Sequence, residues 1–237
     1  NLRKSQKKKA SAEIIDIGGE STRPGSKTNY QKNELKRVKK VIKNFKNNFP
    51  KTFLSIDSRK SLVLDFSLKK RADIINDISC FKFDPKTLNI LKNKNLWKII
   101  HHMQGTPQTM QINPSYSHVL LDIYDFFEKQ IQNFKEDKYN KKIILDPGIG
   151  FGKNLKHNLM ILNKISIFHS LGFPILIGTS RKRFINQISR NYVTKEKIGG
   201  TLSSILFCFS QGIKIFRVHN VEEVKQGLMV FENLLNK

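Results

Sequence analysis

The segment Ile143-Ile144-Leu145-Asp146-Pro147-Gly148-Ile149-Gly150-Phe151-Gly152-Lys153 decides how the chain is expected to fold. It begins with an apolar run, which is typical of a buried parallel strand. The strand ends in an aspartate that enters a turn with three glycines, and glycines let a ligand approach the backbone closely. The same pattern also fits a tight strand-to-helix turn whose Asp146 only caps the next helix. The rest of the chain must therefore show whether this turn is a ligand site or only a structural turn.

Strands and helices are predicted to alternate on both sides of this segment. The strands are expected at 12–17, 53–57, 72–77, 97–101, 143–145, 173–177 and 213–217, and the helices at 1–10, 31–48, 62–70, 86–93, 117–134, 155–169, 181–190, 196–211 and 221–235. Such alternation favours a parallel sheet with right-handed crossovers. The chain of 237 residues suits one α/β domain over residues 1–237.

Seven strands are one fewer than a TIM (β/α)8 barrel contains. The chain begins with Asn1 and a predicted helix, so we expect the first strand of the barrel and its loop to be missing. The two strand edges left unpaired would invite aggregation, and the 237-residue chain alone is expected to bind its ligand weakly.

The composition limits the partners and the compartment. A formal charge of +24 would suit a nucleic acid or an anionic membrane, but the lysines are scattered over predicted helix faces and loops. We therefore expect a solvated lysine-rich surface, no nucleic-acid partner and no membrane partner. Cys80 and Cys208 lie far apart in the sequence, which argues against a disulfide framework and favours the reducing cytoplasm.

Polar residues stand where the predicted strands end. They are Asp16, Asp57, Asn76, His102, Asp146, Ser180 to Lys182, Arg217 and His219. In a parallel barrel the active site lies at the C-terminal ends of the strands. Several carboxylates on one rim repel one another unless a ligand or a counter-charge compensates them, so these residues predict a binding site.

Two loops add candidate anion-binding groups. The loop over 16–25 reads DIGGESTRPG, and it is either a flexible connection or a mobile loop that brings Arg23 to an anion. The segment GTSRK at 178–182 is expected to cap a helix with Thr179 or Ser180 and to form an anion or carbonyl site there. Arg217 and His219 follow the last strand, a region where barrels often bind phosphate.

Taken together, these motifs resemble the dihydropteroate synthase family of folate biosynthesis. The resembling segments are DIGGESTRPG at 16–25, IDSRK at 56–60, IINDI at 74–78, HHMQGTPQTMQ at 101–111, LDPGIGFGKN at 145–154, GTSRK at 178–182 and RVHNV at 217–221. They cover nearly the whole chain in the order of the family. The resemblance implies a transferase with a TIM barrel, which joins 6-hydroxymethyl-7,8-dihydropterin diphosphate to 4-aminobenzoate and releases pyrophosphate with the help of Mg²⁺.

The resemblance also implies a role for individual residues. Asp57, Asn76, Asp146 and Lys182 would hold the pterin, while Thr22, Pro24, Phe151 and Ser180 would surround the aminobenzoate. Arg217 would lie along the pterin and meet the diphosphate together with Arg23 and His219. Lys182, Arg217 and Arg23 are the predicted catalytic residues. The family also suggests a homodimer formed through the last helices.

The chemistry of the residues agrees with these roles. A carboxylate such as Asp146 can accept the adjacent N–H donors of a pterin in pairs. Cations at the diphosphate and carboxylates near the ring both favour the departure of pyrophosphate.

The sequence departs from the family in two places. The family's metal-contacting Asn belongs to the segment expected to be missing, so no metal ligand is assigned here. His101 stands where the family usually has an apolar residue, and it forms a poor metal pair with His102 because neighbouring strand residues point to opposite faces. Asp16, Glu20 and Asp77 are expected to be structural.

Two other functions remain open on the sequence. A pterin-binding methyltransferase domain that carries methyltetrahydrofolate would share the carboxylates and Asn76, but it has no diphosphate to hold. The candidate anion-binding residues Arg23, Ser180 to Lys182, Arg217 and His219 argue against it. A basic nucleic-acid-binding protein would need its basic and aromatic residues clustered on one face.

Overall fold

A computed structural model describes residues 12–23, 25–26, 28–190 and 197–235. The predicted helix at 1–10 lies outside these described residues. In the described part the chain forms a parallel sheet whose strands appear in sequence order: β1 (Ile14–Gly18), β2 (Phe53–Asp57), β3 (Ile74–Asp77), β4 (Trp97–His101) and β5 (Ile143–Asp146). A bridge between Leu145 and Ile175 links β5 to the segment of β6 (Leu176–Ile177), which pairs with β7 (Ile215–Phe216).

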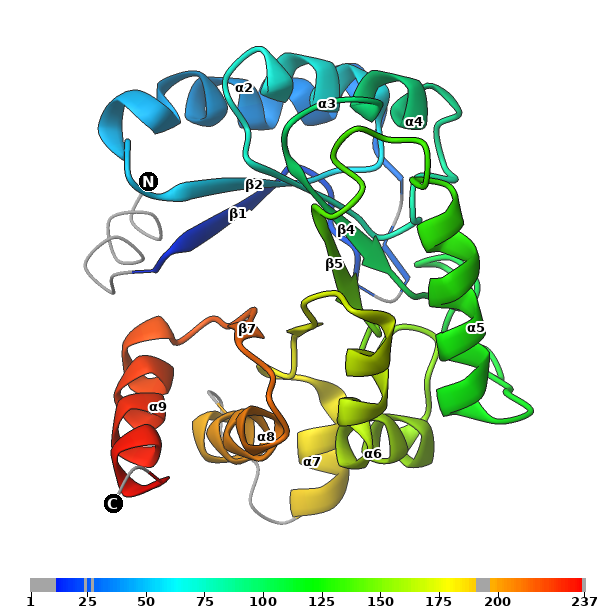
Figure 1. Ribbon diagram of the computed structural model, residues 1–237, viewed down its shortest axis with the longest axis vertical. Helices are drawn as coiled ribbons and strands as arrows, with labels where there is room; N and C mark the ends of the chain where they lie inside the picture. Colours follow the sequence, from blue (N-terminus) through cyan, green and yellow to red (C-terminus); the bar gives the residue numbers. More distant parts are fainter. Residues whose placement is uncertain (1–11, 24, 27, 191–196, 236–237) are drawn as a thin grey trace.

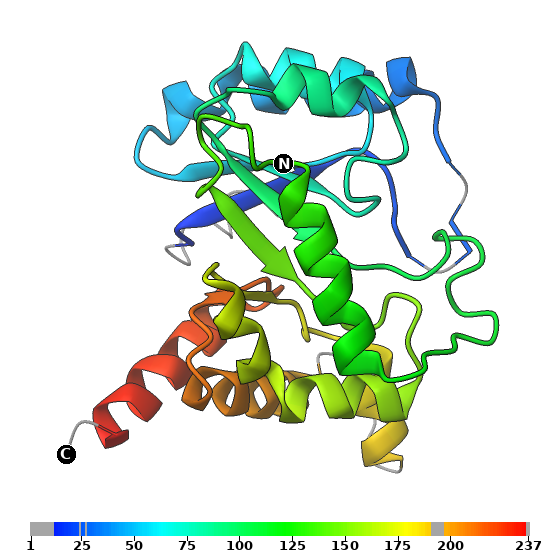
Figure 2. The ribbon, with the colours of Figure 1, turned by 45° about the vertical axis from the view of Figure 1, so that its right-hand side comes forward.

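Helices cover the outside of the sheet (Figure 1). They are α2 (Gln31–Asn48), α3 (Ser61–Leu68), α4 (Lys86–Leu91), α5 (Val119–Gln132), α6 (Leu155–Asn163), the 3-10 helix η1 (Ile165–Leu171), α7 (Arg183–Ser189), α8 (Ile198–Ser210) and α9 (Val221–Leu235). α2, α3 and α4 lie side by side above the sheet, whereas α6 to α9 lie together below it. In the turned view, the green helix α5 runs between the two groups (Figure 2).

The amphipathic pattern explains how these helices attach. In α2, the residues Val38, Ile42 and Phe45 recur every three or four positions, and all three are buried. They join the outward-facing residues of the sheet, among them Leu54 and Ile100, in one hydrophobic core. The exposed face of α2 carries lysines, as expected for a solvated surface.

A second, smaller apolar cluster fills the inside of the sheet. Ile74, Ile99, Ile144 and Leu176 form it, one from each of four strands. Because side chains alternate along a strand, the residues two positions further on point to the same inner face. Polar side chains therefore follow directly above this apolar cluster, at the C-terminal ends of the strands.

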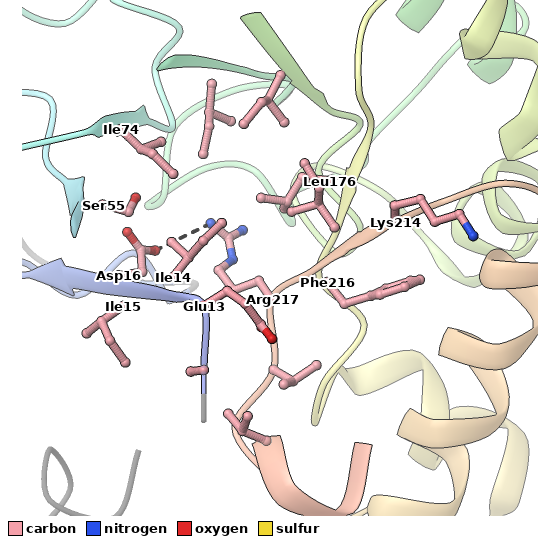
Figure 3. Close-up of a pocket in the computed structure, with 16 residues that line it drawn as sticks. Glu13, Ile14, Ile15, Asp16, Ser55, Ile74, Leu176, Lys214, Phe216 and Arg217 are labelled. Atoms are coloured by element: carbon pink, nitrogen blue, oxygen red, sulfur yellow. Dashed lines mark ion pairs between the residues drawn. The ribbon is translucent and has the colours of Figure 1, made fainter. Parts of the chain in front are cut away.

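The strands curve into an α/β barrel, as predicted, but the described residues leave it open. β1 and β7 are the two edge strands, and they form no pairing with each other in the described ranges. A cavity of about 310 Å³ lies between them, lined by Ile14 and Ile15 of β1, by Ile215 and Phe216 of β7, and by the inner apolar cluster (Figure 3).

Nearly all predicted elements are found in the described residues, although several bounds differ. Strand β3 begins at Ile74, and β6 and β7 are each two residues long instead of five. Two helices also differ. The helix expected at 155–169 changes at Lys164 from α6 into the 3-10 helix η1, which ends at Gly172 with a positive φ of 77°. The helix expected from residue 181 begins at Arg183, because Arg181 takes a left-handed conformation with φ of 60°. Among the described helices, none is both long and apolar enough to cross a bilayer.

Candidate active site

Six polar side chains meet inside the barrel at the C-terminal ends of the strands. They are Asp16, Asp57, Asn76, His101, Asp146 and Arg217, and we call this set the polar layer. The strand register places His101 beside Asp146 and Asn76 beside Asp57. The structure thus brings together the four predicted site residues Asp57, Asn76, Asp146 and Arg217.

Asp146 is the most strongly bonded member of the polar layer. Its Oδ2 accepts from His101 Nδ1 at 3.2 Å and from Arg217 Nη2 at 3.1 Å, while its Oδ1 accepts the N–H of Gly148 at 2.8 Å. Burial alone raises the pKa of Asp146, but the facing donors outweigh burial and hold the pKa below its usual 3.8. Asp146 is therefore an ionised acceptor, and three of its roughly four acceptor positions are already occupied.

The other two carboxylates of the polar layer repel each other. Burial, and then the neighbouring Asp16, raise the pKa of Asp57 from 3.8 to about 8. Among the described residues, Arg217 forms ion pairs with both Asp16 and Asp146, and its charge also acts on Asp57. Its Nη1 lies 3.8 Å from Asp16 Oδ2 (Figure 3). A bound ligand with N–H donors would relieve this repulsion.

Three acceptor atoms of the polar layer are buried without a hydrogen-bond partner in the described part of the chain. They are Asp16 Oδ1, Asn76 Oδ1 and His101 Nε2. Buried polar atoms are nearly always satisfied in native proteins, so unsatisfied ones that share a site point to a ligand. All three atoms are acceptors in this arrangement, which fits a ligand rich in N–H donors.

Lys182 and Phe151 border the polar layer on the side of the glycine-rich turn. Lys182 Nζ lies 4.3 Å from the centre of the Phe151 ring, a cation–π contact. Burial, and then the charge of Arg217, lower the pKa of Lys182 to about 8. Gly150 has a φ of 80°, and a Cβ there would come within 3.3 Å of the Lys182 side chain, so glycine at this position makes room for the lysine.

The GTSRK segment is built differently from the prediction. Neither Thr179 nor Ser180 caps a helix: Lys182 is the N-cap residue of α7, and it makes no capping bond with its side chain. Ser180 Oγ instead lies 2.9 Å from His219 Nδ1, and it accepts the backbone N–H of His219 at 3.2 Å. The structure therefore joins the predicted residues Ser180 and His219 into one pair.

The loop after β1 is held by its neighbours rather than by the polar layer. Glu20 bonds Arg59 and Lys60, which confirms the expected structural role of Glu20 and explains the two cations of the IDSRK motif. Arg23 is exposed, and no side-chain contact joins it or Thr22 to the polar layer among the described residues. Pro24 lies outside the described residues.

His101 and His102 point in opposite directions, as predicted. His102 Nδ1 accepts from Lys153 Nζ at 2.9 Å, and the same ammonium donates to the carbonyl of Phe151 at 2.9 Å. This contact fixes the end of the glycine-rich turn against the loop after β4. Burial lowers the pKa of Lys153 well below 10.5. The negative charge of Asp146 acts in the opposite direction and offsets only part of this effect.

The sequence assigned no ligand contact to two members of the polar layer, although Asp16 was among the strand-end residues that predicted a site. Asp16 was expected to be structural, and His101 was considered only as a metal ligand. Strand alternation does place both on the inner face, beside Asn76 and Asp146, and this signal was available. Asp77 is indeed structural, because its carboxylate accepts the N–H groups of Ser79 and Phe81 in the following turn.

The described side chains do not form a metal site of their own. In those ranges, no group of three or more His, Cys, Asp or Glu residues is arranged to hold a metal ion. Any metal bound at this site would have to take further ligands from elsewhere, for example from the oxygens of a bound substrate.

Comparison with known proteins identifies relatives over nearly the whole chain. The profile of the family described as pterin binding enzyme matches residues 5–219. The dihydropteroate synthase of Escherichia coli (strain K12) is 39% identical over 228 residues, which span 96% of this chain and 80% of the relative.

Two solved structures share the fold. A dihydropteroate synthase from Yersinia pestis in complex with a sulfonamide drug superposes with a TM-score of 0.93 at 34% identity, over 100% of this chain and 85% of the other. A dihydropteroate synthase from Thermus thermophilus in complex with 4-aminobenzoate gives a TM-score of 0.90 at 30% identity, over 98% and 88% of the two chains.

Proposed function

The chain belongs to the dihydropteroate synthases of the pterin-binding enzyme family, and from this premise we propose that its polar layer binds the pterin ring of the substrate. As a member it is a transferase of folate biosynthesis, which condenses 6-hydroxymethyl-7,8-dihydropterin diphosphate with 4-aminobenzoate to 7,8-dihydropteroate and pyrophosphate. This membership replaces the methyltransferase and nucleic-acid-binding interpretations.

One observation carries the proposed pterin site. An ionised Asp146 stands beside three buried acceptors that have no partner within the described residues. The edge of a pterin offers a ring N–H and an amino group side by side, and these donors match such a set of acceptors. Asp57, Asn76 and Asp146 would orient the ring, and Lys182 would donate to its carbonyl oxygen or to a ring nitrogen.

The cations are proposed to act on the other end of the substrate. Departure of pyrophosphate leaves positive charge on the pterin methylene and negative charge on the leaving group. Arg217 is the cation of the polar layer, bonded to Asp146, and the pair of Ser180 and His219 follows on the same rim. Arg23 would join them from its exposed loop to bind the diphosphate, while Thr22, Pro24, Phe151 and Ser180 would surround the aminobenzoate.

The cofactor is proposed to be Mg²⁺. A diphosphate supplies the oxygen ligands that Mg²⁺ prefers, and the ion would neutralise charge on the leaving group. Because the described side chains offer no three-ligand group, we assign no step to the metal. Activity measured after chelation tests this proposal. Activity that is lost on chelation and restored by added Mg²⁺ would support it, and activity that survives chelation would contradict it.

Pyrophosphate release tests the proposed function. Release should require both the pterin diphosphate and 4-aminobenzoate, and mass spectrometry should find one molecule of dihydropteroate for each pyrophosphate. Arg217→Ala should lower turnover by about 10- to 100-fold, since a charge-assisted contact is lost. Arg183→Ala, a change of an exposed arginine on α7, is the matched control and should leave turnover unaltered. Release that does not depend on 4-aminobenzoate would contradict the assignment.

We also propose that the chain forms a homodimer through its last helices. Large apolar side chains are exposed on α8 and α9, namely Phe207, Met229, Val230, Leu234 and Leu235. Such a patch favours burial against a second copy. Sedimentation velocity should therefore show a dimer, and Met229→Glu should convert it to a monomer. A monomeric wild-type protein at micromolar concentration would remove this proposal.

A location in the cytoplasm is the remaining proposal. Cys80 and Cys208 are both buried and unpaired, which suits a reducing compartment. Fractionation of the source cells would test it.

A further inference from the structure

Glu20 is a buried carboxylate in the loop that carries Arg23. Its side chain is only 5% exposed, and it joins the start of this loop to the far end of the loop and to the segment after β2. We propose that Glu20 is a positioning residue, which fixes the loop over 20–29 so that Arg23 is held at the mouth of the site to meet the diphosphate. This inference rests on the proposed role of Arg23 and names the residue on which that role depends.

One carboxylate ties the two ends of the loop together. Glu20 Oε1 accepts the backbone N–H of Asn29 at 2.7 Å, nine residues further along the chain. The same carboxylate pairs with Arg59 Nε at 3.0 Å and with Lys60 Nζ at 2.9 Å. Burial alone would raise the pKa of Glu20, but the Lys60 ammonium and the Asn29 N–H outweigh burial and hold the pKa below 4.5. An ionised Glu20 thus closes a compact loop of the kind that often carries functional residues.

Further buried contacts fix the base of the loop. Arg59 and Lys60 lie just after β2, and both side chains are buried. Lys60 Nζ also pairs with Glu34 of α2, whose side chain is fully buried. A Cβ on Gly19 would lie 2.8 Å from the Glu34 side chain, so glycine lets the start of the loop pass directly against α2. Such charges keep one arrangement, because moving one partner leaves a buried charge uncompensated.

The other side of the loop docks on the segment after β4. The N–H of Gly25 donates to the Pro107 carbonyl at 2.9 Å. Gln108 Nε2 donates to the Ser26 carbonyl at 3.0 Å. Because β2 and β3 lie between β1 and β4 in the sheet, the loop reaches past the ends of both intervening strands (Figure 2). Arg23 therefore lies between the buried anchor and this second contact, at the rim where the polar layer ends.

The loop sets the position of the Arg23 guanidinium. Arg23 is exposed, and no side-chain contact holds it to the polar layer within the described residues. Its carbonyl accepts the N–H of Ser26 at 3.0 Å, so the backbone at Arg23 belongs to a turn of the anchored loop. A loop that is in place before the ligand arrives loses less conformational freedom on binding, which raises the affinity for the group it contacts. Releasing Glu20 should therefore weaken the diphosphate contact and leave the pterin contact unaltered.

Two substitutions at Glu20 and one at Arg23 test this coupling. Glu20→Gln keeps an acceptor oxygen but removes the charge, whereas Glu20→Asp keeps the charge but withdraws it by one methylene. Calorimetry would measure the affinities for 6-hydroxymethylpterin and for 6-hydroxymethylpterin diphosphate, first in each single variant and then in combination with Arg23→Ala. Glu128→Gln, the same chemical change at an exposed position of α5, is the matched control.

We expect Glu20→Gln to lower the affinity for the diphosphate ligand by at least about fivefold, while the affinity for 6-hydroxymethylpterin stays within about twofold of wild type. Once Arg23 is replaced by alanine, Glu20→Gln should cause no further loss, because the group that it positions is gone. Glu20→Asp should show the same cancellation with a smaller loss. A residue that only maintains the fold would weaken both ligands, with and without Arg23.

Three results would overturn the inference. They are an unaltered diphosphate affinity in both Glu20 variants, losses that multiply with the loss in Arg23→Ala, and an Arg23→Ala variant that binds the diphosphate like wild type. A wild-type protein that binds neither ligand would instead contradict the proposed function, and the inference that rests on it would fail with it.

A measurement on the wild-type protein covers the case in which the variants fail to fold. Hydrogen exchange of the Asn29 amide reports on its bond to Glu20. Because coupling between a ligand and a loop is reciprocal, bound 6-hydroxymethylpterin diphosphate should slow this exchange by at least about fivefold. Bound 6-hydroxymethylpterin should not. An exchange rate that the bound diphosphate leaves unchanged would overturn the inference independently of any substitution.

Discussion

Replacing Asp146 by asparagine is expected to lower the affinity for a pterin by about 2 to 3 kcal/mol, or roughly 30- to 150-fold. The change keeps the shape of the side chain but exchanges one acceptor oxygen for an NH2 group. In the structure every neighbour of the carboxylate is a donor: the N–H of Gly148, the Nδ1 of His101 and the guanidinium of Arg217. Whichever way the amide turns, its NH2 group therefore faces a donor. The ligand must then compete with the protein donors for the single acceptor oxygen that remains.

Calorimetry with 6-hydroxymethylpterin measures this effect directly. Asp65→Asn provides the matched control, because it makes the same chemical change at an exposed pair with Lys69 on α3, far from the polar layer. Exposed pairs of this kind contribute less than about 1 kcal/mol, so the control should bind the pterin like wild type. An affinity of Asp146→Asn within twofold of the wild-type value would exclude Asp146 from the pterin site.

The fold could be predicted almost completely from the sequence because its signals are local. Apolar runs such as 143–145 and the three-four spacing of Val38, Ile42 and Phe45 mark strands and helices without knowledge of tertiary contacts. The boundaries could not be predicted as well. Strand β3 begins at Ile74 rather than at residue 72, and the Asp73 side chain just before it accepts the N–H of Leu54.

The start of α7 was missed for a related reason. Ser180 is a good helix cap in isolation, but it is 39 residues from His219 in sequence and bonded to it in space. That tertiary bond removes Ser180 from capping. Only the folded chain shows that the Ser180 hydroxyl bonds His219 instead of the N-terminus of the helix.

The candidate site was predicted in part. Asp57, Asn76 and Asp146 could be found because they end strands, and the structure gathers them in one layer. His101 also ends a strand, but its importance depends on which atoms its two nitrogens meet, and strand alternation does not give that information. The roles of Arg23 and Thr22 stay predictions, since their loop contacts the segment around Pro107 rather than the polar layer in the described residues.

Replacing Asp57 by asparagine is expected to change stability and ligand affinity in opposite directions. Burial, and then the charge of Asp16, raise the pKa of Asp57 from 3.8 to about 8 in the folded protein. Between these two values the folded protein holds a proton that the unfolded chain has already released. The stabilising contribution of the protonated carboxyl is therefore complete below about pH 4 and is lost as the pH rises toward about 8.

Asparagine resembles the protonated carboxyl in shape but does not titrate. Since Asp16 shares the repulsion with Asp57 and both residues are only partly buried, we expect Asp57→Asn to exceed wild type in free energy of unfolding by on the order of 2 kcal/mol at pH 9. This difference should shrink steadily toward pH 5. Affinity for 6-hydroxymethylpterin should meanwhile fall by about tenfold, because an acceptor for the N–H donors of the ring is lost.

Urea unfolding at pH 5, 7 and 9 gives the stability of each variant, and calorimetry gives the affinity. Asp65→Asn again serves as the control and should follow the pH dependence of wild type. Asp16→Asn removes the neighbouring charge without touching Asp57, so it should lower the pKa of Asp57 and reproduce part of the stabilisation at pH 9. If Asp57→Asn instead runs parallel to wild type over the whole range, Asp57 is ionised in the free protein, and the repulsion between the two carboxylates is not what a bound pterin relieves.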